Sequence, residues 1–345
     1  MMYACVLHAI GDLRYEAVDD PVPGNGEVLL KIRAAGVCGS DVQRVFEKGT
    51  YHFPTIPGHE FAGEIAAVHE GMDLSLIGRR AAVFPILPCR SCPACEVGEY
   101  AQCESYDYYG SRRDGGFAEY LAVKEWNLVY IPESVSFTEA AMCEPVAVAV
   151  HALSQSGVGL GDTVAVFGAG TIGVLIAEIA KLRGAKNVIM IDIDQAKLEK
   201  AASLGFPLTI NSLGQDAPES IAKLTNGRGA DVVIEGAGAS ASLENCVKSA
   251  KAFGRVVLMG NPVKDMTFSR DAYSGILRKQ LTLRGTWNSS YNTAKNDWMT
   301  AVNAMPSLNL KRLITHHFPL AAGIKAVEAL RDKKELVMKS MYVMG

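Results

Sequence analysis

The chain has 345 residues, enough for about two domains of ordinary size, and its 49% hydrophobic and 21% charged residues exclude a disordered protein. Lys and Arg total 34 against 37 Asp and Glu, which gives a net charge of −3. This balance favours neither a nucleic-acid-binding face nor a basic membrane anchor, and it leaves small molecules or other proteins as partners.

The first 150 residues predict a β-rich domain. Strands are expected at residues 27–34, 62–68 and 80–84, with Gly and Pro between them. The opening residues lack the charged start and apolar run of a signal peptide, so a cytoplasmic location is expected. The weakly charged stretch 145–177 contains too many glycines and polar residues to predict a membrane span.

Residues 160–288 alternate between strand and helix patterns. Apolar strands are expected at 163–167, 188–191, 232–234, 256–259 and 281–283, and helices at 174–183 and 195–204. This alternation predicts an α/β domain, a doubly wound parallel sheet covered by helices on both faces. The tail, with a helix near 322–331, is too short for a third domain. We therefore expect one discontinuous domain of 1–150 with 289–345, and a second of 151–288.

Four of the eight cysteines lie within fifteen residues, in the pattern Cys89-x2-Cys92-x2-Cys95-x7-Cys103. Four thiolates around one point satisfy a tetrahedral zinc ion that is closed to water. A redox dithiol is the alternative, but it would use one pair and leave the other two cysteines without a role. The spacing therefore predicts a structural zinc site.

A glycine-rich loop follows the strand at 163–167 and precedes a helix. In Gly168-Ala-Gly170-Thr-Ile-Gly173 the glycines would allow a tight turn, approach of a pyrophosphate and close packing of the helix. Asp192 ends the next strand. Its carboxylate would accept hydrogen bonds from the ribose hydroxyls of NAD and would repel the 2′-phosphate of NADP. Lys197 reaches the same region or belongs to a solvated helix face. The expected cofactor-binding residues are Gly168, Gly170, Thr171, Ile172, Gly173, Asp192 and Lys197.

Three short segments carry candidate ligands for a second metal ion. They are Cys38-Gly-Ser40-Asp41, Pro57-Gly-His59-Glu60 and Cys143-Glu144-Pro. A buried cysteine and a satisfied core histidine are the plain alternatives. However, the Pro-Gly turn presents His59 and Glu60 together, and Asp41 is a suitable acceptor for the distal nitrogen of His59. A catalytic zinc ion uses three protein ligands and leaves one position open.

In this order and spacing, the motifs resemble the zinc-dependent medium-chain alcohol and polyol dehydrogenases over essentially the whole chain. Within that superfamily, residues 38–41, 109–120, 143–146 and 276–282 are most similar to the galactitol-1-phosphate 5-dehydrogenases. The resemblance implies a GroES-like catalytic domain, a Rossmann domain, NAD, two zinc ions per subunit, and a homodimer or homotetramer. It implies no nucleic acid and no membrane partner.

The resemblance also implies roles for individual residues. Cys38, His59 and Glu144 would bind the catalytic zinc, Glu60 would coordinate it in some states, and Ser40 would relay the alcohol proton. Gln43 stands where sorbitol dehydrogenases tend to carry a histidine, which leaves the exit of the proton relay open.

The expected reaction transfers a hydride from a secondary alcohol of a polyol or polyol phosphate to NAD⁺, with galactitol 1-phosphate as the preferred substrate. The alternatives are a free polyol such as sorbitol, L-threonine, or a non-catalytic nucleotide-binding protein on the same scaffold. A phosphorylated substrate needs a cation. The candidates are Lys48, Arg112, Arg113 and Arg278, with a structural ion pair the better explanation for Arg113.

Overall fold

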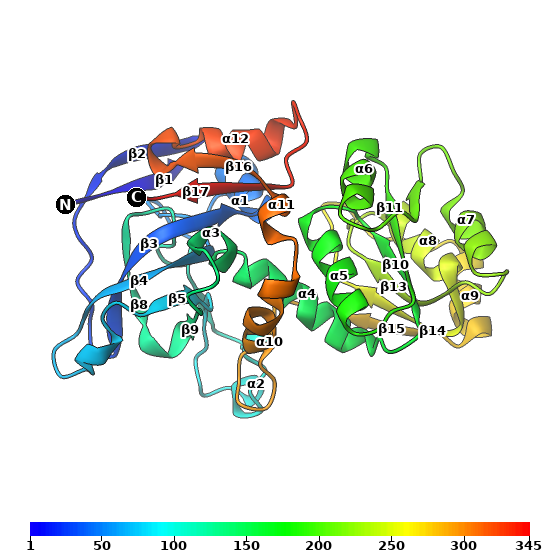
Figure 1. The fold of residues 1–345 in the computed structure, drawn as a ribbon, viewed down its shortest axis with the longest axis horizontal. Helices are drawn as coiled ribbons and strands as arrows, with labels where there is room; N and C mark the ends of the chain where they lie inside the picture. Colours follow the sequence, from blue (N-terminus) through cyan, green and yellow to red (C-terminus); the bar gives the residue numbers. More distant parts are fainter. The chain divides into compact units, whose positions relative to one another are not determined.

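The computed structural model describes all 345 residues and divides into two compact units (Figure 1). The first unit comprises residues 1–147 and 290–345, and the second comprises 148–289. The chain passes from the first to the second within helix α4 (Cys143–Ser156). None of the helices combines the length and apolar character that a bilayer crossing requires.

A seven-stranded sheet organises the first unit. Its strands follow the order β16-β17-β3-β4-β5-β9, and β8 pairs with β3 beside this path. All pairs are antiparallel except β16 with β17. The strands are β3 (Glu27–Val37), β4 (Glu60–Val68), β5 (Arg80–Val83), β8 (Tyr120–Lys124), β9 (Leu128–Tyr130), β16 (Ile314–Pro319) and β17 (Lys339–Val343). The strands expected at 27–34, 62–68 and 80–84 are thus confirmed.

Two hairpin-like pairs and several short helices complete this unit. The pairs are β1 (Met2–Ala9) with β2 (Asp12–Val18), and β6 (Ile86–Leu87) with β7 (Asp107–Tyr108). The helices are α1 (Gly39–Gln43) with its π-helical continuation η1 (Arg44–Lys48), α2 (Pro93–Glu96), α3 (Phe137–Ala140), α10 (Asp297–Ala304), α11 (Leu310–Leu313) and α12 (Lys325–Asp332). Strand β17 from the tail pairs with β3, so the end of the chain completes the sheet.

The second unit is a six-stranded parallel sheet in the order β12-β11-β10-β13-β14-β15. Helices α5 and α6 cover one face, and α7, α8 and α9 cover the other (Figure 1). The strands are β10 (Thr163–Phe167), β11 (Asn187–Asp192), β12 (Thr209–Asn211), β13 (Ala230–Glu235), β14 (Ala250–Leu258) and β15 (Thr282–Gly285). The helices are α5 (Thr171–Leu182), α6 (Gln195–Ser203), α7 (Ala217–Leu224), α8 (Ser240–Ser249) and α9 (Arg270–Lys279).

This order is that of a Rossmann fold, because the third, second and first strands of the unit precede the fourth, fifth and sixth across the sheet. The predicted fold class is therefore confirmed. The order reverses between β10 and β13, where such sheets bind nucleotides outside the carboxyl ends of their strands. The loop Gly168–Gly173 follows β10 at this point.

Candidate metal centres and nucleotide loop

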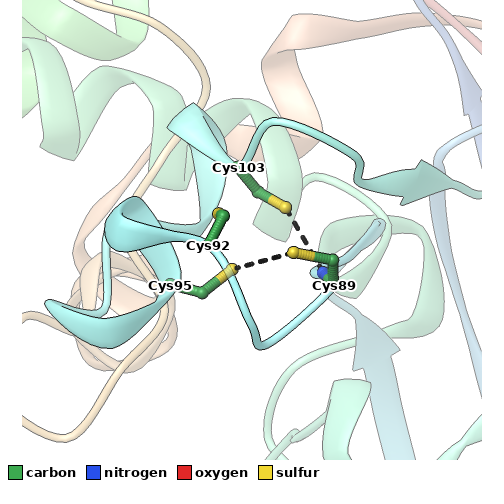
Figure 2. A group of neighbouring side chains, drawn as sticks. All are labelled: Cys89, Cys92, Cys95 and Cys103. Carbon is green, nitrogen blue, oxygen red and sulfur yellow. Dashed lines mark hydrogen bonds between the residues drawn. The ribbon is translucent and has the colours of Figure 1, made fainter.

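The four cysteines of the motif at 89–103 form one group of side chains (Figure 2). Their sulfur atoms all lie within 4.8 Å of one another, and none is in a disulfide. The backbone N–H of Cys89 donates to Sγ of Cys103 at 3.3 Å, and Ser91 lowers the pKa of Cys89 to about 6. A four-thiol set with a readily ionised member fits a tetrahedral zinc ion better than a two-cysteine redox pair.

A second group of metal-ligand atoms lies where two neighbouring strands end. Strand β3 stops at Val37, directly before Cys38, and β4 begins at Glu60, directly after His59. The strands are antiparallel, with Gly36 opposite Glu60, so these ends meet. The ligand atoms of Cys38, His59 and Glu60 lie within 4.8 Å of one another.

Contacts with Asp41 and Arg44 orient His59. Its Nδ1 atom lies 3.5 Å from Oδ1 of Asp41 and 3.4 Å from Nη1 of Arg44. Arg44 Nη1 donates to the same oxygen at 2.8 Å and to Ser40 Oγ at 3.0 Å. The other Asp41 oxygen accepts the Cys38 N–H at 2.9 Å. Because Asp41 lies beside Nδ1, the Nε2 atom of His59 is left for a metal ion.

Neighbouring charges keep both Asp41 and His59 ionised in the metal-free protein. Burial disfavours the ionised form of Asp41, but the neighbouring His59 and Arg44 lower its pKa to about 2. Burial also disfavours the charged form of His59, and Asp41 nevertheless raises its pKa well above the usual value. Asp41 therefore remains a carboxylate over the physiological range and can orient the histidine ring.

Glu60 is engaged by a buried lysine. Lys339 Nζ lies 2.6 and 2.9 Å from the two carboxylate oxygens of Glu60, and both side chains are almost completely buried. Burial disfavours the charge on Lys339, but Glu60 raises its pKa, so the two form an ion pair. Coordination of a metal by Glu60 would have to use an oxygen that already accepts from Lys339, and would place the metal ion close to the lysine charge.

Glu144, in the first turn of α4, lies outside the group of Cys38, His59 and Glu60. It is 7% exposed and makes no hydrogen bond or ion pair within the chain. Burial raises its pKa to about 7, with the charge of His59 opposing the effect and that of Glu60 adding to it. A buried carboxylate without a partner fits a cation that the chain itself does not supply.

Tyr108 on β7 also belongs to these surroundings. It is 7% exposed, and its ring centroid lies 5.7 Å from that of His59. Its hydroxyl makes no hydrogen bond within the chain. Burial, followed by the charge of Glu144, raises its pKa well above the usual value, so the phenol stays protonated.

Sequence reasoning missed Tyr108, Arg44 and Lys339. One signal was available for Lys339, which interrupts the apolar segment 337–343 and would need a carboxylate partner if that segment were buried. Arg44 lies three residues after Asp41 on the same short helical segment, the spacing at which a guanidinium reaches a carboxylate. For Tyr108 the sequence carries no comparable signal.

The basic residues considered for a phosphate are placed differently from one another. Arg112 stacks on the rings of Tyr51 and Tyr106, at 4.5 and 4.3 Å from their centroids. Arg113 pairs with Asp107 at 2.8 Å, which matches the structural ion pair expected for it. Lys48 is exposed and donates to Gln43, and Arg278 lies on α9 of the second unit.

In the second unit the glycines of the loop differ in their surroundings. Gly168 has φ +106°, a conformation that favours glycine, and a Cβ on Gly173 would lie 1.8 Å from the Gly168 carbonyl oxygen. Gly170 caps α5, and a Cβ there would meet nothing within 4 Å. Open space at a helix N-terminus is what an approaching pyrophosphate needs.

Asp192 ends β11 beside this loop. Its Oδ2 atom accepts the Ala169 N–H at 2.7 Å, and its Oδ1 atom accepts the Asp194 N–H at 2.9 Å. Lys197 Nζ lies 4.0 Å from Oδ2. Each carboxylate oxygen has a second lone pair, so Asp192 can hold the loop and still accept further hydrogen bonds.

A Rossmann unit, together with a β-rich unit that carries a four-cysteine lobe and a Cys-His-carboxylate group, defines a zinc-dependent dehydrogenase of the nicotinamide type. Two family models match the chain. The alcohol dehydrogenase GroES-like domain matches residues 24–133, and the zinc-binding dehydrogenase domain matches 171–306.

The chain is similar to curated proteins over nearly its whole length. It is 38% identical to galactitol 1-phosphate 5-dehydrogenase of Escherichia coli K12, covering 90% of this chain and 91% of that protein. It is 36% identical to sorbitol dehydrogenase of Bacillus subtilis strain 168, with coverages of 99% and 97%. The chain therefore belongs to the zinc-dependent medium-chain alcohol and polyol dehydrogenases, and it is an oxidoreductase of that family.

Solved structures agree with this assignment. The crystal structure of galactitol-1-phosphate dehydrogenase from Escherichia coli superposes with a TM-score of 0.93 at 35% identity, covering 99% of this chain and all of that one. A dehydrogenase from E. coli CFT073 in complex with NADH gives 0.91 at 29% identity, with 99% of each chain covered. A protein from Sinorhizobium meliloti 1021 bound to NADP gives 0.92 at 28%, covering 100% and 99%.

Proposed function

We propose that this chain oxidises a secondary alcohol of a polyol phosphate by hydride transfer to NAD⁺, with galactitol 1-phosphate as substrate and a ketose phosphate as product. The likeness to the E. coli enzyme at 38% identity supports this substrate. The group of Cys38, His59 and Glu60, with the buried carboxylate of Glu144 near enough to His59 and Glu60 to feel their charges, is the observation that carries the reaction type.

In the first unit, some of the site residues would bind the metal ion and one would transfer the proton. Cys38, His59 and Glu144 would hold the catalytic zinc, with Glu60 a further donor within reach. Zinc, when bound, acts as a Lewis acid that lowers the pKa of an alcohol and polarises a carbonyl in the reverse direction. Ser40 Oγ would receive the alcohol proton and pass its own hydroxyl proton on toward the cofactor ribose and solvent. Arg44 Nη1 donates to this oxygen at 3.0 Å, which leaves one lone pair and the O–H for the relay.

The four cysteines of the lobe hold a second zinc ion that stabilises the fold without taking part in the reaction. The chain would act in the cytoplasm as a homodimer or homotetramer.

The second unit supplies the nucleotide site. The loop Gly168–Gly173, including Thr171 and Ile172, faces the pyrophosphate, and Asp192 accepts hydrogen bonds from the ribose hydroxyls. A carboxylate at this place repels a 2′-phosphate, which favours NAD over NADP. Lys197 is near enough to Asp192 to take part in ribose binding.

A free polyol is the second candidate substrate. The likeness to sorbitol dehydrogenase of B. subtilis extends over 99% of this chain, against 90% for the galactitol 1-phosphate enzyme. In addition, two of the basic residues considered for a phosphate, Arg112 and Arg113, are already engaged by aromatic rings or a carboxylate.

The test is NADH production from galactitol 1-phosphate, galactitol, sorbitol and L-threonine, with zinc content measured on the same samples. We expect two zinc ions per chain and the highest kcat/KM for galactitol 1-phosphate. Cys38→Ala or His59→Ala should abolish turnover while NAD⁺ binding persists. Equal rates for the phosphorylated and free hexitols would reject the phosphate assignment, and full activity of either variant would remove the metal from the reaction.

A further inference from the structure

Two carboxylates near His59, those of Glu60 and Glu144, are buried, and a catalytic zinc with an open position needs one more protein ligand besides Cys38 and His59. Proximity alone favours Glu60, because its oxygen lies within 4.8 Å of the ligand atoms of Cys38 and His59. The charged groups around the two carboxylates instead favour Glu144 as this ligand.

Glu60 already has a cation. Lys339 Nζ contacts both of its oxygens, at 2.6 and 2.9 Å, and also lies 3.3 Å from the Val37 carbonyl oxygen. Lys339 begins β17, Val37 ends β3 and Glu60 begins β4, and these three strands are neighbours in the sheet. The lysine is therefore fixed by the same strand ends that place Cys38 and His59.

The backbone opposite Glu60 is shaped for this arrangement. Gly36 pairs with Glu60 across β3 and β4, and a Cβ on Gly36 would lie 2.3 Å from Oε2 of Glu60. A side chain at position 36 would therefore displace the Glu60 carboxylate from its place beside Lys339. Lys339 holds it there from the next strand.

When Lys339 is included, two of the buried carboxylates each have a cationic partner. Asp41 is balanced by Arg44, and Glu60 by Lys339. A metal ion binds histidine as the neutral imidazole and cysteine as the thiolate, so with the ion bound at His59 and Cys38 the remaining negative charges are those of Glu144 and Cys38, which a divalent ion would neutralise. A further uncompensated carboxylate in this buried place would be costly.

We infer that Lys339 is a positioning residue that holds Glu60 off the metal, so that Glu144 serves as the carboxylate ligand and one coordination position stays open. This inference rests on the proposed function, since it takes the metal at Cys38 and His59 as given. Without Lys339, the free Glu60 carboxylate would bind the ion and raise its coordination number.

The experiment compares the metal content and the visible spectrum of the cobalt-substituted full chain in a set of variants. The metal content of the Cys38→Ser variant gives the contribution of the cysteine lobe alone. We expect Glu60→Gln to keep the second metal ion and Glu144→Gln to weaken its binding by at least about tenfold. We expect Lys339→Met to change the cobalt spectrum from a four-coordinate to a higher-coordinate form. Lys339→Arg, which keeps the charge, should retain the wild-type spectrum.

The double variant Lys339→Met with Glu60→Gln is the matched control. It removes both charges, so it folds without an unpaired buried ion, and it should return the cobalt spectrum to the wild-type form. A wild-type spectrum in Lys339→Met, or a changed spectrum that persists in the double variant, would overturn the inference. Loss of the second metal in Glu60→Gln but not in Glu144→Gln would also overturn it. A wild-type chain that holds metal only in the cysteine lobe would instead reject the proposed function.

Discussion

Tyr108 is nine-tenths buried as a residue, and its hydroxyl group has no hydrogen-bond partner in the chain. Its ring is fixed against His59, and the charges of Glu144 and Arg44 act on it. Burying a hydroxyl without a partner is unfavourable, so such a group is retained where a ligand supplies the missing bond. A polyol offers hydroxyls next to the carbon that is oxidised, and one of these is the natural partner.

Tyr108→Phe is expected to lower kcat/KM for a polyol by roughly 3- to 10-fold, because one neutral hydrogen bond contributes about 1 kcal/mol. Most of the change should fall on KM, since the phenol binds the substrate and does not transfer the proton. Steady-state kinetics with a polyol and with a secondary monoalcohol check this. An equal loss on both substrates would mean that the hydroxyl acts on a feature the two alcohols share, and not on a neighbouring hydroxyl of the polyol.

The sequence predicts those site residues that lie close to one another along the chain, and it fails for partners that are far apart in sequence. Cys38, Asp41, His59 and Glu60 stand in short motifs that could be interpreted directly, and the structure places them together. Lys339 lies 279 residues from Glu60, and no local sequence pattern predicts the sheet order that brings them together. The pairing of β17 with β3 had to be seen before the lysine could be assigned.

Among whole elements of the second unit, five of the six strands and the helices α5 and α6 were predicted, whereas α7, α8 and α9 were not. Strand β10 has the expected bounds, and β11 and β13 extend the expected ones by one or two residues at each end. Helix α5 begins three residues earlier than expected, because its first turn is formed by residues of the glycine-rich loop. Helices α7 and α8 went unnoticed, since their exposed faces carry mostly polar and small residues.

The loop between β10 and α5 offers a matched pair of glycine substitutions. Gly173→Ala would place a methyl group 1.8 Å from the Gly168 carbonyl oxygen, so the helix must move. We expect a loss of about 1–3 kcal/mol in the free energy of unfolding, together with weaker NAD⁺ binding. Urea unfolding and titration of NAD⁺ fluorescence quenching measure the two effects.

Gly170→Ala is the contrasting change, because its methyl group would enter open space at φ −73°. Its cost to stability should be at most about 1 kcal/mol, the usual cost of alanine at a helix N-cap. NAD⁺ affinity should nevertheless fall, because the methyl group occupies the space that the pyrophosphate approaches. Unchanged NAD⁺ affinity in this variant would contradict the placement of the phosphates at the loop.

At the scale of the whole molecule, the proposed role of Glu144 as a metal ligand predicts that metal binding and folding are coupled through this carboxyl group. Burial gives this carboxyl group a pKa of about 7 in the metal-free protein, against 4.5 for a glutamate in water. The folded state therefore keeps a proton that the unfolded state releases between these two pH values. Since stability falls with rising pH wherever the folded state binds more protons, the metal-free protein loses stability as the pH rises from about 4.5 to 7.

The size of this loss is about 3 kcal/mol, because each unit of pKa corresponds to about 1.36 kcal/mol. Urea unfolding of chelator-treated protein at pH 5 and pH 7.5 should show it, and Glu144→Gln should reduce the pH dependence by this amount, because a glutamine has no proton to release in this range. The part that comes from His59, whose pKa is also raised, stays in both proteins. Comparing the two proteins cancels the effect of emptying the cysteine lobe. Zinc added at pH 7.5 should restore the wild type by neutralising the ionised carboxylate, and should restore Glu144→Gln less. The same pH dependence in both proteins would mean that Glu144 is not the buried acid that the metal relieves.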